Sequence, residues 1–459
     1  MAAAAGVILG AAVPFMPIVG LSMSAKLALG SLLMAIIWWI FAVLPDYVTA
    51  LVLGVLFVSL AKVPTPTVFA AFSGSTWWLL MSAFGLSLGI TKSGLMKRVT
   101  LRLLMLFPGG FRGQTLALLM LGLVVGPFVP SMSAKAAMLA PLSLGISDSL
   151  AYERKGKEAN GLFLAMLTGI RNPGPLFISA SVLGYALLGQ YPEAVRSEFT
   201  MGRWFLCALP LFLCISILNY LAIVRLYAPK CREHSEKADL SAQLSALGPM
   251  SGKEKYMSFI MAGTMLLWIT ESVHGIPAHI VCISALCLTL AGNVFDRRTF
   301  RSDVTWDSII FIGVALGIAP VFGYLGINDW VVGVCSPIFA WMATNPYLLV
   351  FGVGVLTIVL RFVIVSEMTF VNIFMVLAVP IAVELGINPW VVGMAVYALV
   401  TPWFFMYQNP VYMAAFYATD GAMADQRTTT RYCLVYVLIC LTALLISVPF
   451  WIKIGVFFL

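Results

Sequence analysis

Long apolar runs alternate with short polar interruptions along the whole chain. The runs fall at about 26–43, 46–63, 74–94, 204–227, 256–273, 277–293, 305–325 and 432–456. Each is close to the roughly 20 residues that an α-helix needs to cross the hydrocarbon of a membrane, and longer than the roughly 10 of a membrane strand. The pattern predicts an all-α polytopic membrane protein.

Two further apolar runs are each divided by a polar stretch, at corresponding places in the two halves. Residues 130–135 (PSMSAK) divide the run at 114–145, and residues 366–372 (SEMTFVN) divide the run at 346–386. Non-helical backbone at membrane depth is tolerated only inside protein or beside a water-filled cavity. We therefore predict two re-entrant helical hairpins, which in a pair indicate a transporter's binding site.

Each half also contains a span that proline interrupts. Residues 169–175 (GIRNPGP) interrupt the span at 160–190, and residues 407–410 (YQNP) interrupt the span at 388–418. Proline cannot continue a helix because it lacks the backbone N–H and its ring clashes with the preceding turn. The sequence therefore predicts two broken transmembrane helices.

These features divide the chain into two repeats. We expect a first helix and an N-terminal repeat at 1–228, a polar linker at 229–255, and a C-terminal repeat at 256–459. An odd number of crossings in each half, with each hairpin counted as zero, inverts one repeat relative to the other. Most loop Lys and Arg residues then fall on one side, which makes that side and the linker cytoplasmic.

Composition excludes several other classes of protein. With 61% hydrophobic and 10% charged residues, the chain has too little polar surface for a soluble domain. The net charge of +8 is dispersed in loops and forms no nucleic-acid-binding stripe. The 8 Cys and 3 His form no metal-type cluster, and nucleotide-binding and hydrolase motifs are absent from the sequence. We expect neither an enzyme nor a bound cofactor.

Four ionisable residues fall at membrane depth: Lys135, Arg171, Arg361 and Glu367. Such residues are costly there and usually functional. Arg171, in the first helix break, is suited to bind a carboxylate or a similar oxyanion through two N–H groups of its guanidinium. Lys135 would act as a point charge. Alternatively, Arg171 holds loop carbonyls. Arg361 and Glu367 lie in one hairpin, where we expect a charge-balancing ion pair; Glu367 could instead carry a proton.

Polar side chains at the hairpin tips and helix breaks are further candidates for substrate binding. They are Ser131 and Ser133 at the first tip, Thr369 and Asn372 at the second, and Asn172 and Asn409 in the breaks. We expect one half-helix to begin at Ser133 or Ala134 and the other at Thr369 or Phe370, and helix N-termini favour anions. The alternative for the hydroxyls is a hydrogen bond to their own helix backbone.

Several stretches resemble a known family. They are 74–78 (GSTWW), 92–98 (KSGLMKR), 246–254 (ALGPMSGKE), 267–270 (LWIT) and 305–307 (TWD). They are similar to the divalent anion/sodium symporters, the di- and tricarboxylate transporters of the inner membrane, over nearly the whole chain. The resemblance implies a homodimer whose protomers each have a scaffold domain and a transport domain. The transport domain, with its hairpins and broken helices, would carry substrate by an elevator mechanism.

In that family each hairpin tip carries Ser-Asn-Thr, whose side chains bind a substrate carboxylate and whose backbone helps to hold sodium. This chain has Ser131, Met132 and Ser133 at the first tip and Phe370, Val371 and Asn372 at the aligned second position. Both hydroxyls survive at the first tip, and the second lacks the motif. A sodium ion would lie near Ser131, Gly169 and Asn172.

Lys135 lies two residues past the first tip, and Arg171 lies where the first broken helix of the family would line a sodium site, which suggests that fixed cations replace the bound ion. A buried unpaired cation costs several kcal/mol, so an empty site of this kind reorients poorly. We therefore expect sodium-independent exchange of a divalent organic anion. The alternatives are a sodium-coupled dicarboxylate symporter and a carrier of sulfate or another oxyanion.

Overall fold

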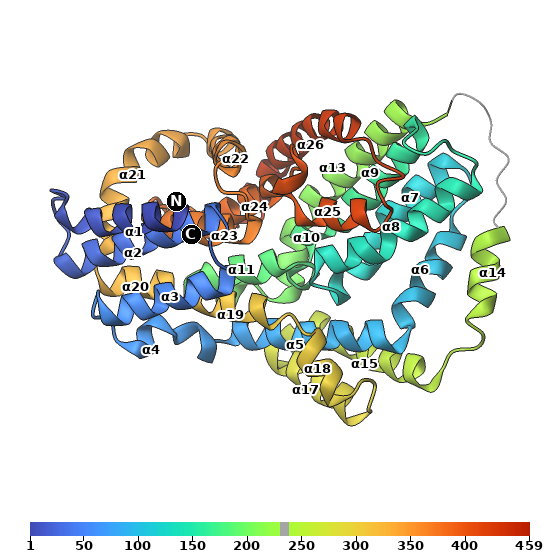
Figure 1. Ribbon diagram of the computed structural model, residues 1–459, viewed down its shortest axis with the longest axis horizontal. Coiled ribbons are helices and arrows are strands. Elements are labelled where there is room, and N and C mark those ends of the chain that lie inside the picture. The colour runs from blue at the N-terminus through green and yellow to red at the C-terminus, as the bar shows by residue number, and fades with distance from the viewer. Residues whose placement is uncertain (230–237) are drawn as a thin grey trace.

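The computed structural model describes residues 1–229 and 238–459. Regular structure in these residues is helical, apart from one isolated bridge between Ile387 and Phe458 (Figure 1). Six helices are long and apolar enough to span a membrane, or seven if the bent pair of residues 75–106 counts as one span. The all-α membrane fold predicted from the apolar runs is thereby confirmed.

The N-terminal half begins with an apolar group, followed by the first hairpin and the first broken helix. The main helices are α1 (Ala2–Ala12), α2 (Met23–Ile40), α3 (Asp46–Ser59), α5 (Ser75–Ser93), α6 (Leu95–Leu106), α7 (Phe111–Val125), α8 (Met132–Ser149), α9 (Lys157–Arg171), α10 (Pro173–Leu176), α11 (Val182–Gln190) and α13 (Met201–Tyr227). Short helices α4 (Thr65–Val68), η2 (Ala70–Ser73), η3 (Gly126–Phe128), η4 (Ile178–Ala180) and α12 (Glu193–Glu198) connect them.

The C-terminal half follows the same order. It contains α14 (Ala238–Ala246), α15 (Gly252–Ile269), α16 (Glu271–His274), α17 (Ala278–Ala291), α18 (Arg297–Asp303), α19 (Trp306–Ala315), α20 (Ile318–Tyr324), α21 (Ile327–Ala343), α22 (Pro346–Arg361), α23 (Glu367–Glu384), α24 (Pro389–Val400), η5 (Met406–Gln408), α25 (Pro410–Tyr417) and α26 (Gln426–Lys453). The apolar runs did not predict α21. Its outward face is apolar, and Trp341 is strongly exposed.

The two halves share one packing pattern. Both α7 and α8 pack on α9, and both α22 and α23 pack on α24, so each hairpin straddles the helix that follows it. The long last helix of each half, α13 or α26, packs on that same helix. At the open end of the first hairpin, the rings of Phe111 and Tyr152 meet edge to face with centroids 6.3 Å apart. This repetition is what two structural repeats predict.

The repeats interlock through their broken helices. Helix α8 of the first hairpin packs on α25, and α23 of the second hairpin packs on α11. The long helices α13 and α26 also pack on each other. A separate group of helices is formed by α1, α2, α3 and α19, with α5, α15 and α17 packed together beside it (Figure 1). Hairpins and broken helices therefore form one interlocked core.

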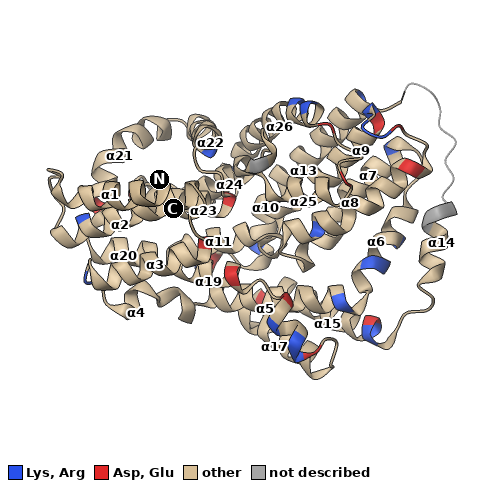
Figure 2. Ribbon diagram, in the orientation of Figure 1, with Lys and Arg blue, Asp and Glu red and all other residues tan. Residues whose placement is uncertain are grey.

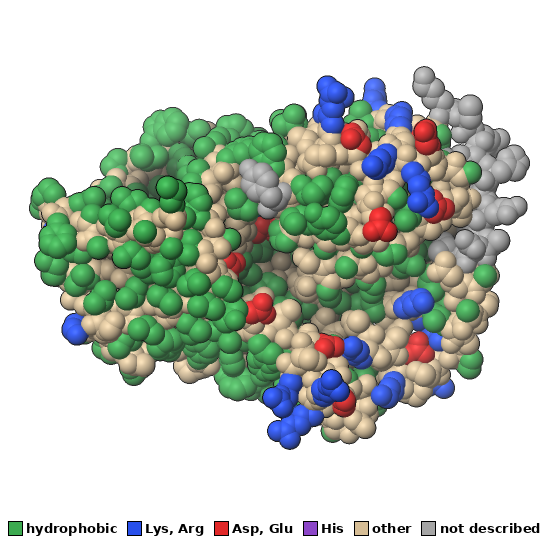
Figure 3. All heavy atoms as spheres, in the orientation of Figure 1, with side chains coloured by type: hydrophobic (Ala, Val, Ile, Leu, Met, Phe, Trp, Pro, Cys, Tyr) green, Lys and Arg blue, Asp and Glu red, His purple; other side chains and the backbone are tan. Residues whose placement is uncertain are grey.

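Charge is distributed unevenly over the molecule. Lys and Arg residues concentrate at the end that contains α6, α15 and the start of α9, at the right in Figure 2. The opposite end is covered largely by hydrophobic side chains (Figure 3). On the same face the surface is hollowed between these two parts, and Asp or Glu side chains border the hollow. An apolar surface of this extent fits a protein surrounded by lipid.

Helices α7 and α9 cross at two glycines. A Cβ atom added at Gly122 would lie 1.6 Å from the Gly169 carbonyl oxygen, and one added at Gly169 would lie 2.4 Å from the Leu118 carbonyl oxygen. The neighbours are backbone atoms, which cannot turn away as a side chain does. The first hairpin therefore sits on the first broken helix only because both positions lack a side chain.

Replacing Gly122 with Ala should separate the two helices and lower the free energy of unfolding by about 3 kcal/mol, at the upper end of overpacking costs. Thermal unfolding of the full-length protein in detergent, followed by tryptophan fluorescence, measures the change. Gly145→Ala is the matched control, because a Cβ atom there meets nothing within 4 Å. Similar melting temperatures for both variants would contradict the close crossing.

Candidate functional site

Both helix breaks expose backbone groups inside the interlocked core. In the first, α9 ends at Arg171, α10 follows Asn172, and Phe177 is extended. In the second, α24 ends at Val400, and Asn409 caps α25 by accepting from the Tyr412 N–H at 2.9 Å. The second break begins before the predicted residues 407–410. Pro402 explains the difference, because proline has no backbone N–H with which to continue the helical hydrogen bonds.

The two half-helices at the tips begin earlier than predicted. Helix α8 begins at Met132, and its N-cap Ser131 accepts a hydrogen bond from the Ala134 N–H. Helix α23 begins at Glu367, and Ser366 caps it in the same way. Serine is a strong N-cap, which fixes both starts. The two tips are therefore Ser131-Met132 and Ser366-Glu367, which corrects the register of the alignment that gave Phe370, Val371 and Asn372.

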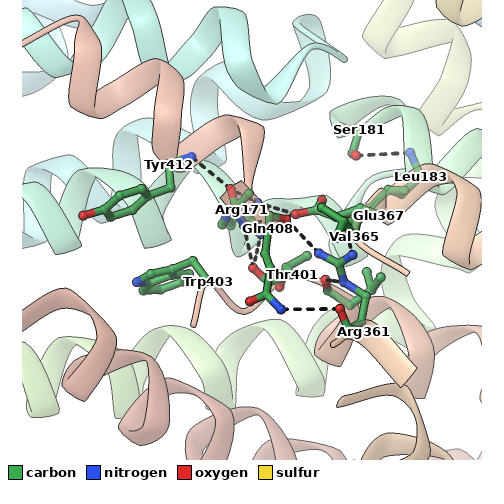
Figure 4. A network of polar contacts seen from close by, with 12 residues as sticks. Arg171, Ser181, Leu183, Arg361, Val365, Glu367, Thr401, Trp403, Gln408 and Tyr412 are labelled. Carbon is green, nitrogen blue, oxygen red and sulfur yellow. Dashed lines mark hydrogen bonds and ion pairs between the residues drawn. The ribbon is translucent and has the colours of Figure 1, made fainter. Parts of the chain in front are cut away.

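Arg171 joins the two repeats. Its NH2 group donates to the Glu367 Oε1 at 2.8 Å and to the Asn409 Oδ1 at 2.7 Å, and its NH1 group donates to the Thr401 carbonyl (Figure 4). Asn409 completes the network by donating through Nδ2 to the Glu367 Oε1 at 3.1 Å and to the Thr401 carbonyl at 3.0 Å. The first break, the second tip and the second break thus meet at one guanidinium.

The prediction that Arg361 and Glu367 form an ion pair is wrong, because Glu367 forms its ion pair with Arg171. Arg361 instead binds backbone carbonyls, through Nε to Val400 at 2.9 Å, NH2 to Gln408 at 2.9 Å, and NH1 to Ile364 at 2.6 Å and to Val365 (Figure 4). These carbonyls belong to the second tip and the second break. The side chain supplies the donors that the interrupted helices lack.

Lys135 has a similar role in the first repeat, although it comes from the other arm of its hairpin. Its side chain extends from α8 and donates through Nζ to the Ala180 carbonyl of η4 at 2.8 Å. The residue is 1% exposed, and the carboxylates in the described part of the chain form no ion pair with it. Lys135 and Arg361 therefore each place a buried cation on carbonyls freed by a helix interruption.

The first break also gathers polar donors. The Asn172 Oδ1 accepts from the Tyr436 hydroxyl at 2.9 Å. Its Nδ2 and the Arg171 Nε are buried and have no hydrogen-bond partner within residues 1–229 and 238–459. A methyl carbon added at Gly174 would lie 2.9 Å from both the Met132 Cε and the Tyr397 hydroxyl, so the first tip and α24 meet at this break. Buried donors without partners are suited to an anion.

The remaining predicted residues make no hydrogen bond with Arg171 in the described part of the chain. Asn372 is in the second turn of α23, where its Oδ1 accepts from the Gln190 Nε2 at 3.1 Å and its Nδ2 donates to the Met368 carbonyl at 2.9 Å. Thr369 is buried, and its hydroxyl has no partner in the described chain. Ser133 is half-buried at the first tip. Asn372 therefore faces α11 and not the guanidinium.

The groups that the resemblance assigns to sodium already face protein. The Ser131 hydroxyl accepts from the Ala134 N–H, the Gly169 carbonyl packs against Gly122, and the Asn172 Oδ1 accepts from Tyr436. No pattern in the sequence selects Tyr436, Tyr397, Thr401 or Gln408. A lone tyrosine in an apolar helix is usually a packing residue, and backbone acceptors carry no sequence signal.

Residues 2–457 match the family described as the sodium:sulfate symporter transmembrane region. The chain belongs to this family. That membership confirms the family expected from the sequence and a multi-pass membrane protein of a transporter class, not an enzyme.

Named relatives in the sodium:sulfate symporter family are distant. The chloroplastic dicarboxylate transporter 2 of Spinacia oleracea is 26% identical over 59% of this chain and 49% of that protein. The L-tartrate/succinate antiporter of Escherichia coli (strain K12) is 26% identical over 57% of this chain and 55% of that protein. The chain thus matches about half the length of these curated relatives.

A solved structure shares the fold. The Alcanivorax borkumensis YdaH transporter superposes with a TM-score of 0.59 at 15% identity, and the alignment covers 93% of this chain and 98% of that one. At this identity the likeness concerns the fold alone.

Arg361 should be required for stability whatever the substrate. Replacing it with Met keeps an apolar stem but leaves four carbonyls without donors, so we expect the free energy of unfolding to fall by about 3 kcal/mol or more. Thermal unfolding in detergent measures this. Arg154→Met is the control, since that side chain is 66% exposed. Equal melting temperatures would mean that the carbonyls find other partners.

Proposed function

We propose that the protein is a secondary carrier that exchanges divalent organic anions, namely C4 to C6 di- or tricarboxylates, across the cytoplasmic membrane without sodium. The observation that carries this proposal is the set of fixed cations at the helix interruptions. Arg361 binds four backbone carbonyls of the second tip and break, the type of oxygen ligand that a sodium ion would use. A cationic side chain in this place removes the need for a bound sodium ion.

The charge of the site favours a dianion. With Lys135 protonated, the three cations Lys135, Arg171 and Arg361 and the carboxylate Glu367 leave a formal charge of +2. Charge buried without compensation costs several kcal/mol, so the site is expected to cross the membrane only when an anion balances it. This constraint makes exchange of one anion for another the natural mode of transport.

Donors at the first break support an oxyanion as the ligand. The Arg171 Nε and the Asn172 Nδ2 belong to adjacent residues and are unpaired in the part of the chain that the structure describes. A carboxylate offers two oxygens that match such donors. The names of the relatives, a dicarboxylate transporter and an L-tartrate/succinate antiporter, also support organic anions.

We further propose that the interlocked core moves as an elevator against the helices around α1–α3 and α5, and that a homodimer anchors these. A cavity of about 560 Å³ supports a boundary between the two groups. Gln190, Met375 and Val379 of the core line one side of the cavity, and Ala71 and Gly74, next to α5, line the other. A water-accessible gap at this boundary is suited to one group sliding past the other.

A sodium-coupled symporter, or a carrier of sulfate or another oxyanion, is the second candidate. The family description itself names sodium and sulfate, which favours it. The two candidates differ in ion dependence and in the anion that competes, so one transport assay separates them.

Counterflow with the purified protein in sodium-free proteoliposomes tests the proposal. We expect uptake of labelled succinate only when the vesicles are loaded with succinate or L-tartrate, at the same rate with or without a sodium gradient. Vesicles without internal anion, and vesicles with an Arg171→Met variant, are the controls. Uptake that depends on a sodium gradient whatever anion is inside, or that only sulfate supports, would contradict the proposal.

A further inference from the structure

The pairing of Arg171 with Glu367 leaves part of the guanidinium unused. Only the NH2 group reaches the carboxylate, and it contacts a single oxygen, Oε1, at 2.8 Å. The Nε–H is buried and has no partner among the described residues. A carboxylate placed side-on would engage Nε and NH2 together, in the bidentate geometry that arginine favours. A free carboxylate could therefore bind Arg171 more completely than Glu367 does.

Glu367 also lies on the more accessible side of the pair. Its side chain is 13% exposed, whereas that of Arg171 is 1% exposed. In Figure 4 the Glu367 carboxylate extends from the start of α23 toward the first break. An anion that approaches from water meets this carboxylate before the guanidinium, and two carboxylates repel each other at such a distance. Binding of the anion to Arg171 requires that Glu367 leave.

The pair also ties together two separate parts of the core. Arg171 ends α9 in the first repeat, and Glu367 begins α23 at the tip of the second hairpin. The second tip has an independent support, because Arg361 binds the Ile364 and Val365 carbonyls without Glu367. Loss of the Arg171 contact would therefore release the tip from the first break without unfolding it, while α23 stays packed on α11.

We propose that the Glu367 carboxylate occupies, in the empty carrier, the position that a substrate carboxylate takes on Arg171, so that substrate displaces it and releases the tip of the second hairpin from Arg171. The inference rests on the proposed function, since it assumes an anionic substrate at Arg171. Glu367 acts here as an internal competitor. It lowers the affinity for substrate and makes release of the hairpin tip depend on substrate.

Glu367→Gln is the direct test, because it keeps the shape of the side chain and removes its charge. Titration calorimetry of the purified full-length protein with succinate, and separately with L-tartrate, should give a Kd about tenfold lower than that of the parent protein. That factor corresponds to a pair that is closed for about nine-tenths of the time. A gain in affinity is a change that mere damage to the fold does not produce.

Two further variants make the test decisive. Glu384→Gln removes the same charge from the other end of α23 and should leave the Kd unchanged. If Glu367→Gln fails to fold, Glu367→Met replaces it, since Met132 begins the first hairpin's helix in the same position.

Equal or weaker binding in a folded Glu367 variant overturns the inference while the proposed function stands. No binding of either anion to the parent or the variant overturns the proposed function, and the inference with it.

Discussion

A helix that is interrupted inside a membrane must find hydrogen-bond partners for the backbone groups that it exposes, because lipid offers none. In this protein three long cationic side chains meet that requirement. Arg361 binds carbonyls of the second tip and break, Lys135 binds a carbonyl beyond the first break, and Arg171 reaches across to the Thr401 carbonyl. The interruptions are therefore stable only with positive charge beside them.

That positive charge links the fold to the function. The interlocking of α8 with α25 and of α23 with α11 brings the interruptions of both repeats into one core. Glu367 offsets part of this charge by pairing with Arg171. In the function that we propose, an anionic substrate offsets the rest. Preference for a divalent anion and displacement of Glu367 both follow from that single arrangement.

Much of the fold could be predicted because its signals are local. Apolar runs predicted the membrane helices, and Pro173, Pro175 and Pro410 predicted both breaks. The errors have physical causes: Ser131 and Ser366 cap helices earlier than the alignment indicated, and Pro402 ends α24 sooner than expected. Helix α21 is apolar but is only 17 residues long and contains Pro337, and no membrane span was expected there.

The site was only partly predictable, because its partners are distant in sequence. The ionisable residues at membrane depth could be selected because burying a charge there is energetically costly. Which of them pair with each other could not be predicted in this way. Their nearness along the chain suggested an ion pair between Arg361 and Glu367. In the structure the repeats interlock, and Glu367 forms its ion pair with Arg171. Tyr436 and Tyr397 lie in apolar helices, where no pattern distinguishes a tyrosine that orients an amide from one that packs.

The most direct test of the account is an experimental structure of the full-length protein with succinate bound. We expect one succinate carboxylate on the Arg171 Nε and NH2 groups, with the Glu367 carboxylate moved out of hydrogen-bond distance and Arg361 still on its backbone carbonyls. Succinate bound elsewhere while Glu367 remains on Arg171, or a sodium ion on the carbonyls that Arg361 occupies, would contradict it.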